Sequence, residues 1–282
     1  MSSIKELITR AESTLAASGI AEPRREAMSL LALALQQDKT FLYARPEYVP
    51  STSEIALFDS FLERRSRREP LQYISGVQEF YGLEFDVTRD VLIPRPETEL
   101  LVEESLKILR ETGGDGICEV GTGSGCIVVS ILKELSNVTA VGLDRSSDAL
   151  KIARRNSEKH GVGGRLELIE SDVFDALSNE KFDVIISNPP YVPAVDINGL
   201  QPEVRDFEPH LALTDDLDGL SIIRRIVEGS PRFLKSRGHL VMEIGFNQSP
   251  AVVKMFDRSR WTAPELAPDL QGIPRIVSAR LI

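Results

Sequence analysis

The chain has 282 residues, of which 42% are hydrophobic and 27% are charged; this composition is ordinary for a globular protein and excludes the disordered and fibrous classes. It carries 43 acidic and 33 basic residues, a net charge of −10, which disfavours broad attraction to a phosphate backbone and favours a protein substrate over naked nucleic acid. No stretch approaches the roughly 18 continuous apolar residues that span a bilayer, and the first residues lack the apolar core of a signal peptide, so we expect a cytoplasmic protein. Cys118 and Cys126 lack metal-ligand spacing; we expect both to be small buried residues and expect no metal.

Residues 1–71 are predicted to form a small helical domain. Apolar residues recur there at helical spacing in two stripes: Ile4, Leu7, Ile8, Ala11 and Leu15, then Met28, Leu30, Leu31, Leu33, Ala34 and Leu35. Pro23 suits the first turn of the second helix, and a third helix is expected at residues 53–68. The basic run at residues 63–69 is interpreted as a solvated helix end whose cations complement the helix dipole, with contact to an RNA-like or acidic partner as the alternative.

Residues 72–89 contain short strand-like pieces around Gly76 and Gly82, which predict a β-hairpin that bridges two domains. The next segment, residues 93–99, reads IPRPETE, and Pro96 can open the helix that follows. Arg95, Glu97 and Thr98 either line an entrance between the domains or belong to an ordinary helix start.

From Gly116 onward, strands and helices alternate, so residues 90–282 are predicted to form an α/β domain with a parallel sheet and helices on both faces. We expect strands at residues 117–120, 139–143, 166–169, 184–187, 238–244 and 274–281. The expected helices run through Ile131, from Ser147, and over residues 220–234.

The sequence Asn188-Pro189-Pro190-Tyr191 directly follows a predicted buried strand at residues 182–187. Two prolines hold a stiff turn whose carbonyl groups stay free to accept hydrogen bonds. The side-chain oxygen of Asn188 and the carbonyl of Pro189 can each accept one N–H of a planar NH2 group, while Tyr191 supplies a flat face and a hydroxyl. The turn therefore indicates recognition of an amide or an aromatic amine.

A glycine loop follows the strand at residues 117–120, and its sequence is Glu119-Val120-Gly121-Thr122-Gly123-Ser124-Gly125. Glycines there permit a tight turn and close approach of a ligand, but the loop lacks full dinucleotide spacing and a P-loop lysine. Asp144 ends the next strand and can hold the two hydroxyls of a ribose. Asp172 ends the third strand and can accept from an adenine amine, with Val173 against the ring. Together these strand ends indicate a nucleoside ligand; the alternative for each aspartate is a helix cap.

With these motifs the chain resembles the class I S-adenosylmethionine-dependent methyltransferases, and specifically the HemK/PrmC family of release factor glutamine methyltransferases. The resemblance runs from end to end. Besides the glycine loop and the turn at residues 188–191, it rests on the following blocks: residues 93–99, Glu208-Pro209, Asp218-Gly219-Leu220, Met242-Glu243-Ile244-Gly245, and Asp269-Leu270 before Arg275. Glu119 stands where aspartate is frequent in the family, and Val173 where an aromatic residue can occur.

The resemblance implies a Rossmann-like, seven-stranded domain that methylates the glutamine of the Gly-Gly-Gln motif of peptide-chain release factors, with S-adenosylmethionine as cofactor. The N-terminal helical domain would contact the release factor. Catalysis would fall to Asn188, Pro189 and Tyr191, with Pro190 also in contact with substrate, and no direct nucleic-acid binding is expected. The implied cofactor-binding residues are Glu119, Gly121, Thr122, Gly123, Ser124, Gly125, Asp144, Asp172, Val173 and Asn188.

Three other functions remain open from the residues. The same turn could serve methylation of a glutamine in a ribosomal protein, or of adenine in nucleic acid, since adenine also presents a planar NH2 group. A non-enzymatic adaptor that retains the cofactor fold is the third. Glu208-Pro209-His210 is expected to brace the loop after the turn, with His210 in a structural role, because the transfer requires no histidine base.

Overall fold

The computed structural model describes residues 2–282, and these form two compact units. One unit holds the chain up to Gly76 together with Gln201–Phe207, and the other holds Val77–Leu200 and Glu208–Ile282. No helix within the described part of the chain is long and apolar enough to cross a membrane. The domain limits expected from the sequence, 1–71, 72–89 and 90–282, remain predictions.

The first unit is helical. Its helices are α1 (Ile4–Ala17), α2 (Pro23–Leu35), α3 (Lys39–Ala44), α4 (Thr52–Ser66), α5 (Leu71–Ser75) and the short α9 (Pro202–Arg205). α1 and α4 each begin with a capping box, at Ser3 with Glu6 and at Ser51 with Glu54, and α2 begins at Pro23 as predicted. The predicted apolar stripes of α1 and α2 are buried in one core, except that Leu33 is only partly buried.

The basic run at residues 63–69 is not the solvated helix end that we expected. Arg65 is only 5% exposed; its guanidinium contacts the carboxylate of Glu26 and lies 3.0 Å from that of Glu203. Arg68 also pairs with Glu203, at 2.6 Å. These acids lie 39 and 138 residues from Arg65, so a local reading of the charge run could not find them. Arg67 does behave as expected, since its side chain is 74% exposed.

The second unit begins with the expected hairpin, β1 (Val77–Phe80) and β2 (Leu83–Asp86). It continues into a seven-stranded sheet in the order β5-β4-β3-β6-β7-β9-β8, which confirms the predicted α/β fold. Five neighbouring strands are parallel to one another: β5, β4, β3, β6 and β7. β9 is antiparallel to β7, and β8 is antiparallel to β9. The sheet strands are β3 (Gly116–Val120), β4 (Thr139–Asp144), β5 (Leu166–Glu170), β6 (Phe182–Ser187), β7 (Leu234–Glu243), β8 (Glu265–Pro268) and β9 (Pro274–Arg280).

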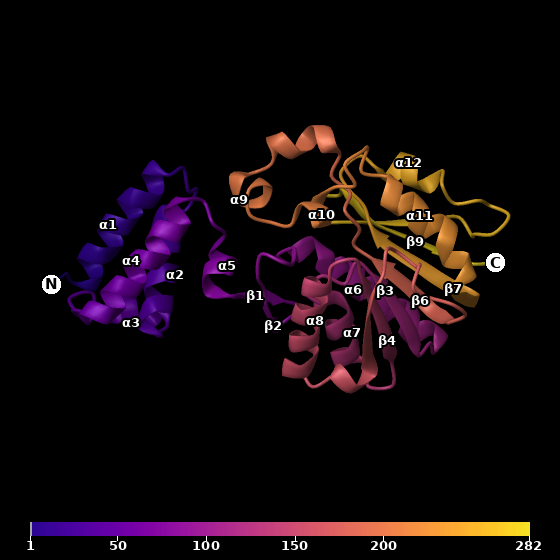
Figure 1. Ribbon diagram of the computed structural model, residues 1–282, viewed down its shortest axis with the longest axis horizontal. Coiled ribbons are helices and arrows are strands. Elements are labelled where there is room, and N and C mark those ends of the chain that lie inside the picture. Colours follow the sequence, from indigo (N-terminus) through magenta and orange to yellow (C-terminus); the bar gives the residue numbers. More distant parts are fainter. Residues whose placement is uncertain (1) are drawn as a thin grey trace. The chain divides into compact units, whose positions relative to one another are not determined.

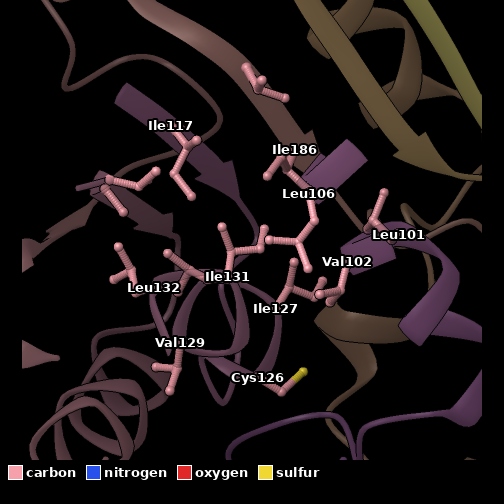
Figure 2. Close-up of a cluster of buried hydrophobic side chains, with 14 of the residues drawn as sticks. Leu101, Val102, Leu106, Ile117, Cys126, Ile127, Val129, Ile131, Leu132 and Ile186 are labelled. Carbon is pink, nitrogen blue, oxygen red and sulfur yellow. The ribbon is translucent and has the colours of Figure 1, made fainter. Parts of the chain in front are cut away.

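Helices cover both faces of this sheet, as predicted. α6 (Glu99–Thr112), α7 (Cys126–Glu134) and α8 (Ser147–Lys159) lie together on one side, and α11 (Ser221–Gly229) and α12 (Ser249–Val253) lie on the other (Figure 1). Successive strand residues alternate between the two cores: Ile117 and Ile186 belong to the first, Cys118 and Ile185 to the second. Figure 2 shows the first core, where side chains of α6 and α7 meet those of β3 and β6. The predicted burial of both cysteines is confirmed.

Several elements of the second unit differ from the sequence prediction. The helix expected at residues 220–234 is shorter, because α11 ends at Gly229, a 3-10 turn η4 (Ser230–Arg232) follows and β7 already begins at Leu234. β8 was not predicted, because this edge strand is mostly exposed and has no alternating apolar pattern. The 3-10 turn η3 (Ala194–Gly199), α9 and α10 (His210–Leu213) were also missed, since segments this short carry no periodic signal.

Candidate active site

Two adjacent strands carry the two motifs of the site. β3 and β6 run parallel with Val120 opposite Ser187, so the glycine loop after β3 and the turn after β6 leave the sheet side by side. A Cβ added to Gly121 would lie 3.8 Å from the carbonyl oxygen of Asn188. The strand order reverses here, with β4 on one side of β3 and β6 on the other. Open α/β sheets bind ligands at such a reversal.

A cavity of about 400 Å³ opens at this reversal, a volume within the range of small-molecule sites. The structure brings most of the predicted site residues together in its lining, namely Gly121, Thr122, Gly123, Ser124, Asp144, Asp172, Val173, Asn188 and Pro190. Four predicted site residues are not part of the lining: Glu119, Gly125, Pro189 and Tyr191. Arg95, Thr98 and His210 also face the cavity.

Backbone amides hold the glycine loop against β4. The N–H groups of Gly121 and Thr122 donate to the carbonyl of Leu143 at 2.8 and 3.0 Å. Gly125 has a φ of +80°, and a Cβ there would lie 3.2 Å from the Cβ of Ala153 on α8. Position 125 therefore needs glycine both for the turn and for helix packing.

Asn156 on α8 fixes the same loop, and the sequence analysis missed it. Its side chain is fully buried. Nδ2 donates to the carbonyls of Ser124 and Asp86 at 2.8 and 3.0 Å, and Oδ1 accepts from the N–H of Asp86 at 2.8 Å. The side chain thus ties the glycine loop to the end of β2. Its one sequence signal is a polar residue on the apolar face of an amphipathic helix.

Asp144 places its carboxylate between two loop amides. One oxygen accepts from the N–H of Gly123 at 2.7 Å and the other from the N–H of Ser146 at 2.8 Å. Burial raises the pKa of this carboxyl, and the hydrogen bonds from Ser146 and Gly123 oppose that rise. Asp144 is not the cap of α8, because the side chain of Ser146 caps that helix. Each oxygen keeps a second lone pair for a ligand hydroxyl.

Glu119 is a fully buried acid, and the backbone N–H of Val128 is the polar group that favours its ionised form. Its side chain is 0% exposed, and neither carboxylate oxygen forms a hydrogen bond of ordinary geometry within residues 2–282. Burial raises the pKa of the carboxyl well above its ordinary value. An unpaired buried carboxyl is costly; that Glu119 holds the ammonium of the cofactor remains a prediction, beside a structural role near the loop.

The end of β5 contributes Asp172 and Val173. Asp172 is not a helix cap, because the segment after it is not helical; its carboxylate pairs with Arg225 on α11 at 2.9 Å. Val173 has a φ of +56°, which is a strained conformation for a β-branched residue. The role of each in holding an adenine ring remains a prediction.

A buried polar network lies behind Asn188. Nδ2 of Asn188 donates to the hydroxyl of Thr98 at 3.2 Å, and this hydroxyl donates to Oε2 of Glu243 at 2.7 Å. The hydroxyl of Tyr191 donates to Oε1 of Glu243 at 3.1 Å. Burial raises the pKa of Glu243, opposed by the bonds from Thr98 and Tyr191. The pKa of Tyr191 is raised by burial and by the carboxylate of Glu243, so this phenol is no base near neutral pH.

The backbone of Tyr191 is held separately. Nε2 of Gln248 donates to the carbonyl of Tyr191 at 2.8 Å, and Oε1 of Gln248 accepts from the N–H of Gly245 at 2.8 Å. Gly219 has a φ of +74°, and a Cβ there would lie 2.2 Å from the carbonyl oxygen of Tyr191. No other residue type fits at position 219 without displacing the turn.

Glu208 joins the loop after the turn to the segment before α6. Its buried carboxylate accepts from the N–H of Ile93 at 3.2 Å and from the guanidinium of Arg95. This bracing role was expected from the sequence. His210 pairs with Asp216 at 2.6 Å.

Comparison with known proteins decides the family. Residues 6–76 match the family described as PrmC N-terminal domain, and residues 111–257 match a methyltransferase domain. The release factor glutamine methyltransferase of Geobacter sulfurreducens is 41% identical over 99% of this chain and 96% of its own length. That of Cereibacter sphaeroides is 42% identical over 95% of this chain and 94% of its own length. The chain belongs to the release factor glutamine methyltransferase family.

Other similarities are more partial. The bifunctional methyltransferase of Rickettsia typhi is 36% identical over 98% of this chain, which spans 57% of that protein. Among solved structures, a methyltransferase from Pyrococcus furiosus has a TM-score of 0.52 at 15% identity and covers 78% of this chain and 98% of its own. The hMettl16 catalytic domain has a TM-score of 0.57 at 16% identity and covers 70% of this chain and 75% of its own. These two structures support the fold alone.

Membership of the release factor glutamine methyltransferase family confirms the resemblance seen in the sequence. The blocks that carried it now have structural positions. Gly219 and Gly245 lie against Tyr191, Glu208 holds the segment at residues 93–95, and Asp269 pairs with Arg275 at 3.0 Å. The individual roles of the site residues remain predictions.

Proposed function

We propose that this chain transfers a methyl group from S-adenosylmethionine to the side-chain amide nitrogen of the glutamine in the Gly-Gly-Gln motif of peptide-chain release factors. The orientation of Asn188 is the observation that carries the proposal. Its Nδ2 donates to Thr98, and its Oδ1 accepts no hydrogen bond within residues 2–282. Asn188 lines the cavity, and a carboxamide oxygen that accepts no hydrogen bond from the protein is suited to accept an N–H of the substrate.

The difficulty of the reaction explains why such an acceptor matters. An amide nitrogen is a poor nucleophile, because its lone pair is delocalised into the carbonyl. S-adenosylmethionine, when bound, supplies an electrophilic methyl group on its sulfonium, and its sulfur keeps the electron pair of the broken S–CH3 bond and leaves as a neutral thioether. Oδ1 of Asn188 and the carbonyl of Pro189 accept the two N–H groups and orient the nitrogen. As the nitrogen forms its bond to carbon, its N–H groups become more positive and these hydrogen bonds strengthen. One proton then passes to water.

Tyr191 and Pro190 complete the substrate side. The Tyr191 phenol is committed to Glu243, so its ring, rather than its hydroxyl, would pack against the substrate amide and exclude water. Pro190 lines the cavity and would contact the aliphatic stem of the glutamine.

Most of the residues proposed to hold the cofactor line the cavity, and Glu119 and Gly125 adjoin lining residues along the chain. Asp144 has lone pairs left for the hydroxyls of a ribose, and the buried carboxyl of Glu119 would receive the ammonium of the methionine part. Asp172 and Val173 would border the adenine. The backbone of the glycine loop would approach the ligand closely at the following residues: Gly121, Thr122, Gly123, Ser124 and Gly125.

We assign recognition of the release factor to the helical unit. Its match to the PrmC N-terminal domain at residues 6–76 supports this role. The unit also exposes four large apolar side chains, which a bound partner could cover: Tyr43, Tyr48, Val49 and Leu57.

Methyl transfer from radiolabelled S-adenosylmethionine tests the proposal against its rivals. The acceptors are a purified release factor, its Gly-Gly-Ala variant, a ribosomal-protein mixture and DNA, assayed in parallel. The proposal predicts label in the release factor and none in the variant. Label only in ribosomal protein or only in DNA would replace it with the corresponding methyltransferase, and cofactor binding without transfer would favour an adaptor.

A further inference from the structure

The Thr98 hydroxyl has one proton and two acceptor lone pairs. It lies 2.7 Å from Oε2 of Glu243, which in the ionised form only accepts hydrogen bonds. With Glu243 ionised, the proton of Thr98 is therefore directed to its carboxylate. The hydroxyl oxygen can then only accept from Asn188, 3.2 Å away, and the group of Asn188 that donates is Nδ2.

We propose that Thr98, held by Glu243, is a positioning residue that fixes the side-chain amide of Asn188 with Nδ2 turned inward and Oδ1 presented to the substrate. This inference rests on the proposed function, because it explains how Asn188 acquires the orientation that the transfer needs. Without the relay, the Asn188 amide can rotate by half a turn. Nδ2 would then face the substrate and repel the N–H groups that Oδ1 accepts.

The relay is built from separate elements that the fold brings together. Thr98 ends the 3-10 turn η1 (Pro96–Thr98) before α6, Asn188 follows β6, and Glu243 ends β7 next to β6. Thr98 and Glu243 are each 2% exposed. Charge-assisted hydrogen bonds in such a dry site are strong and hold one geometry. Tyr191 occupies the other oxygen of Glu243, so one carboxylate orients both ends of the turn at residues 188–191.

The relay depends on the charge of Glu243. A protonated Glu243 can donate to Thr98, and the Thr98 hydroxyl can then donate to Asn188. In that arrangement Oδ1 is the group drawn inward and the substrate loses its acceptor. Four groups act on this carboxyl: Thr98 and Glu97 from η1, Tyr191 from the turn and Arg275 from β9.

A matched pair of variants tests the relay. Thr98→Val removes the hydroxyl at nearly constant volume, and Thr98→Ser keeps it. With a release factor as substrate, we expect Thr98→Val to lower kcat on the order of 10-fold to 100-fold, because a misplaced acceptor acts mainly on the reacting geometry. We expect Thr98→Ser to retain kcat within about threefold. The Kd for S-adenosylmethionine should change little in either variant. Equal kcat values for wild type and Thr98→Val would overturn the relay.

A spectroscopic readout separates failure of the relay from failure of the proposed function. The side-chain NH2 resonances of Asn188 are assigned in asparagine-labelled protein by comparison with Asn188→Ala. We expect Thr98→Val to shift them and Thr98→Ser to leave them near the wild-type position. Unchanged resonances in Thr98→Val would contradict the relay, even if the release factor proved not to be the substrate. A wild-type enzyme that is inactive on release factor would contradict only the proposed function.

Discussion

The hydroxyl of Tyr191 lies 3.1 Å from a carboxylate oxygen of Glu243, and it donates to an acid that is almost fully buried. Tyr191→Phe removes this donor but keeps the ring. We therefore expect a small loss of kcat, about threefold to tenfold, and a loss of stability of about 1 kcal/mol. Tyr191→Leu also removes the aromatic face and should lower kcat further. Steady-state kinetics and urea unfolding measure both effects; a Tyr191→Phe enzyme as impaired as Tyr191→Leu would mean that the hydroxyl acts directly on the substrate.

Glu243 should impose a pH dependence on turnover. Burial raises its pKa above the ordinary 4.5, and only the ionised form directs the Thr98 proton away from Asn188. We expect kcat to rise with pH through this raised pKa and to fall as the solution becomes more acidic. Glu243→Gln cannot ionise and should lose this limb of the profile. A profile of kcat against pH that is the same in Glu243→Gln and wild type would assign the limb to another group.

Glu119 should destabilise the free protein as the pH rises. The pKa of this carboxyl is about 4.5 in the unfolded chain and lies well above 4.5 in the folded protein, because the group is buried there. At a pH between the unfolded and the folded pKa, the unfolded chain has released a proton that the folded chain keeps. Stability then falls with pH by up to about 1.4 kcal/mol per pH unit. Glu119→Gln removes this loss, and its stability advantage should grow with pH in urea unfolding.

The same substitution should weaken binding of S-adenosylmethionine, because the ammonium loses its anionic partner. Calorimetric titration measures this effect. A Glu119→Gln protein that binds the cofactor as tightly as wild type would show that the acid does not contact it.

Gly219 should be intolerant of any side chain. A Cβ there would lie 2.2 Å from the carbonyl oxygen of Tyr191, at a φ of +74°. We expect Gly219→Ala to cost about 1–3 kcal/mol of stability and to lower kcat, because the turn must move. Gly199→Ala is the matched control, since a Cβ there meets nothing within 4 Å. Similar unfolding midpoints for the two variants would show that the turn adapts without strain.

The ion pairs of Arg65 should stabilise the helical unit. Removing one partner of a buried pair leaves uncompensated charge, so Arg65→Met should cost about 3 kcal/mol. Arg67→Met, at a largely exposed side chain, should change stability by less than about 0.5 kcal/mol. Amide hydrogen exchange in residues 201–207 should accelerate only in Arg65→Met, because Glu203 loses a partner. Unchanged protection of that segment would mean that its other contacts suffice to hold it.

The sequence predicted the parts of the molecule that depend on local patterns. Strand ends, the glycine loop and the stiff turn are each set by neighbours in the chain, and the structure gathers most of them at one cavity. Asp144 lies beside Gly123 in the structure, in line with the expected grouping of these strand ends, because parallel strands end at the same edge of the sheet.

Contacts between distant residues could not be predicted in this way. Glu243 was part of a family block but had no assigned role, since its partners Thr98 and Tyr191 lie 145 and 52 residues away. Asn156 and Arg65 were missed for the same reason. Each is a polar residue that burial makes important, and burial depends on packing that a local window does not contain.

Tandem mass spectrometry of the release factor, after incubation with the chain and S-adenosylmethionine, locates the transferred methyl group. We expect one methyl group on the side-chain amide nitrogen of the glutamine in the Gly-Gly-Gln motif. We expect none when the wild-type chain is replaced by Asn188→Ala, a variant that should still bind the cofactor. A methyl group on any other residue, or full modification by Asn188→Ala, would contradict the proposed function.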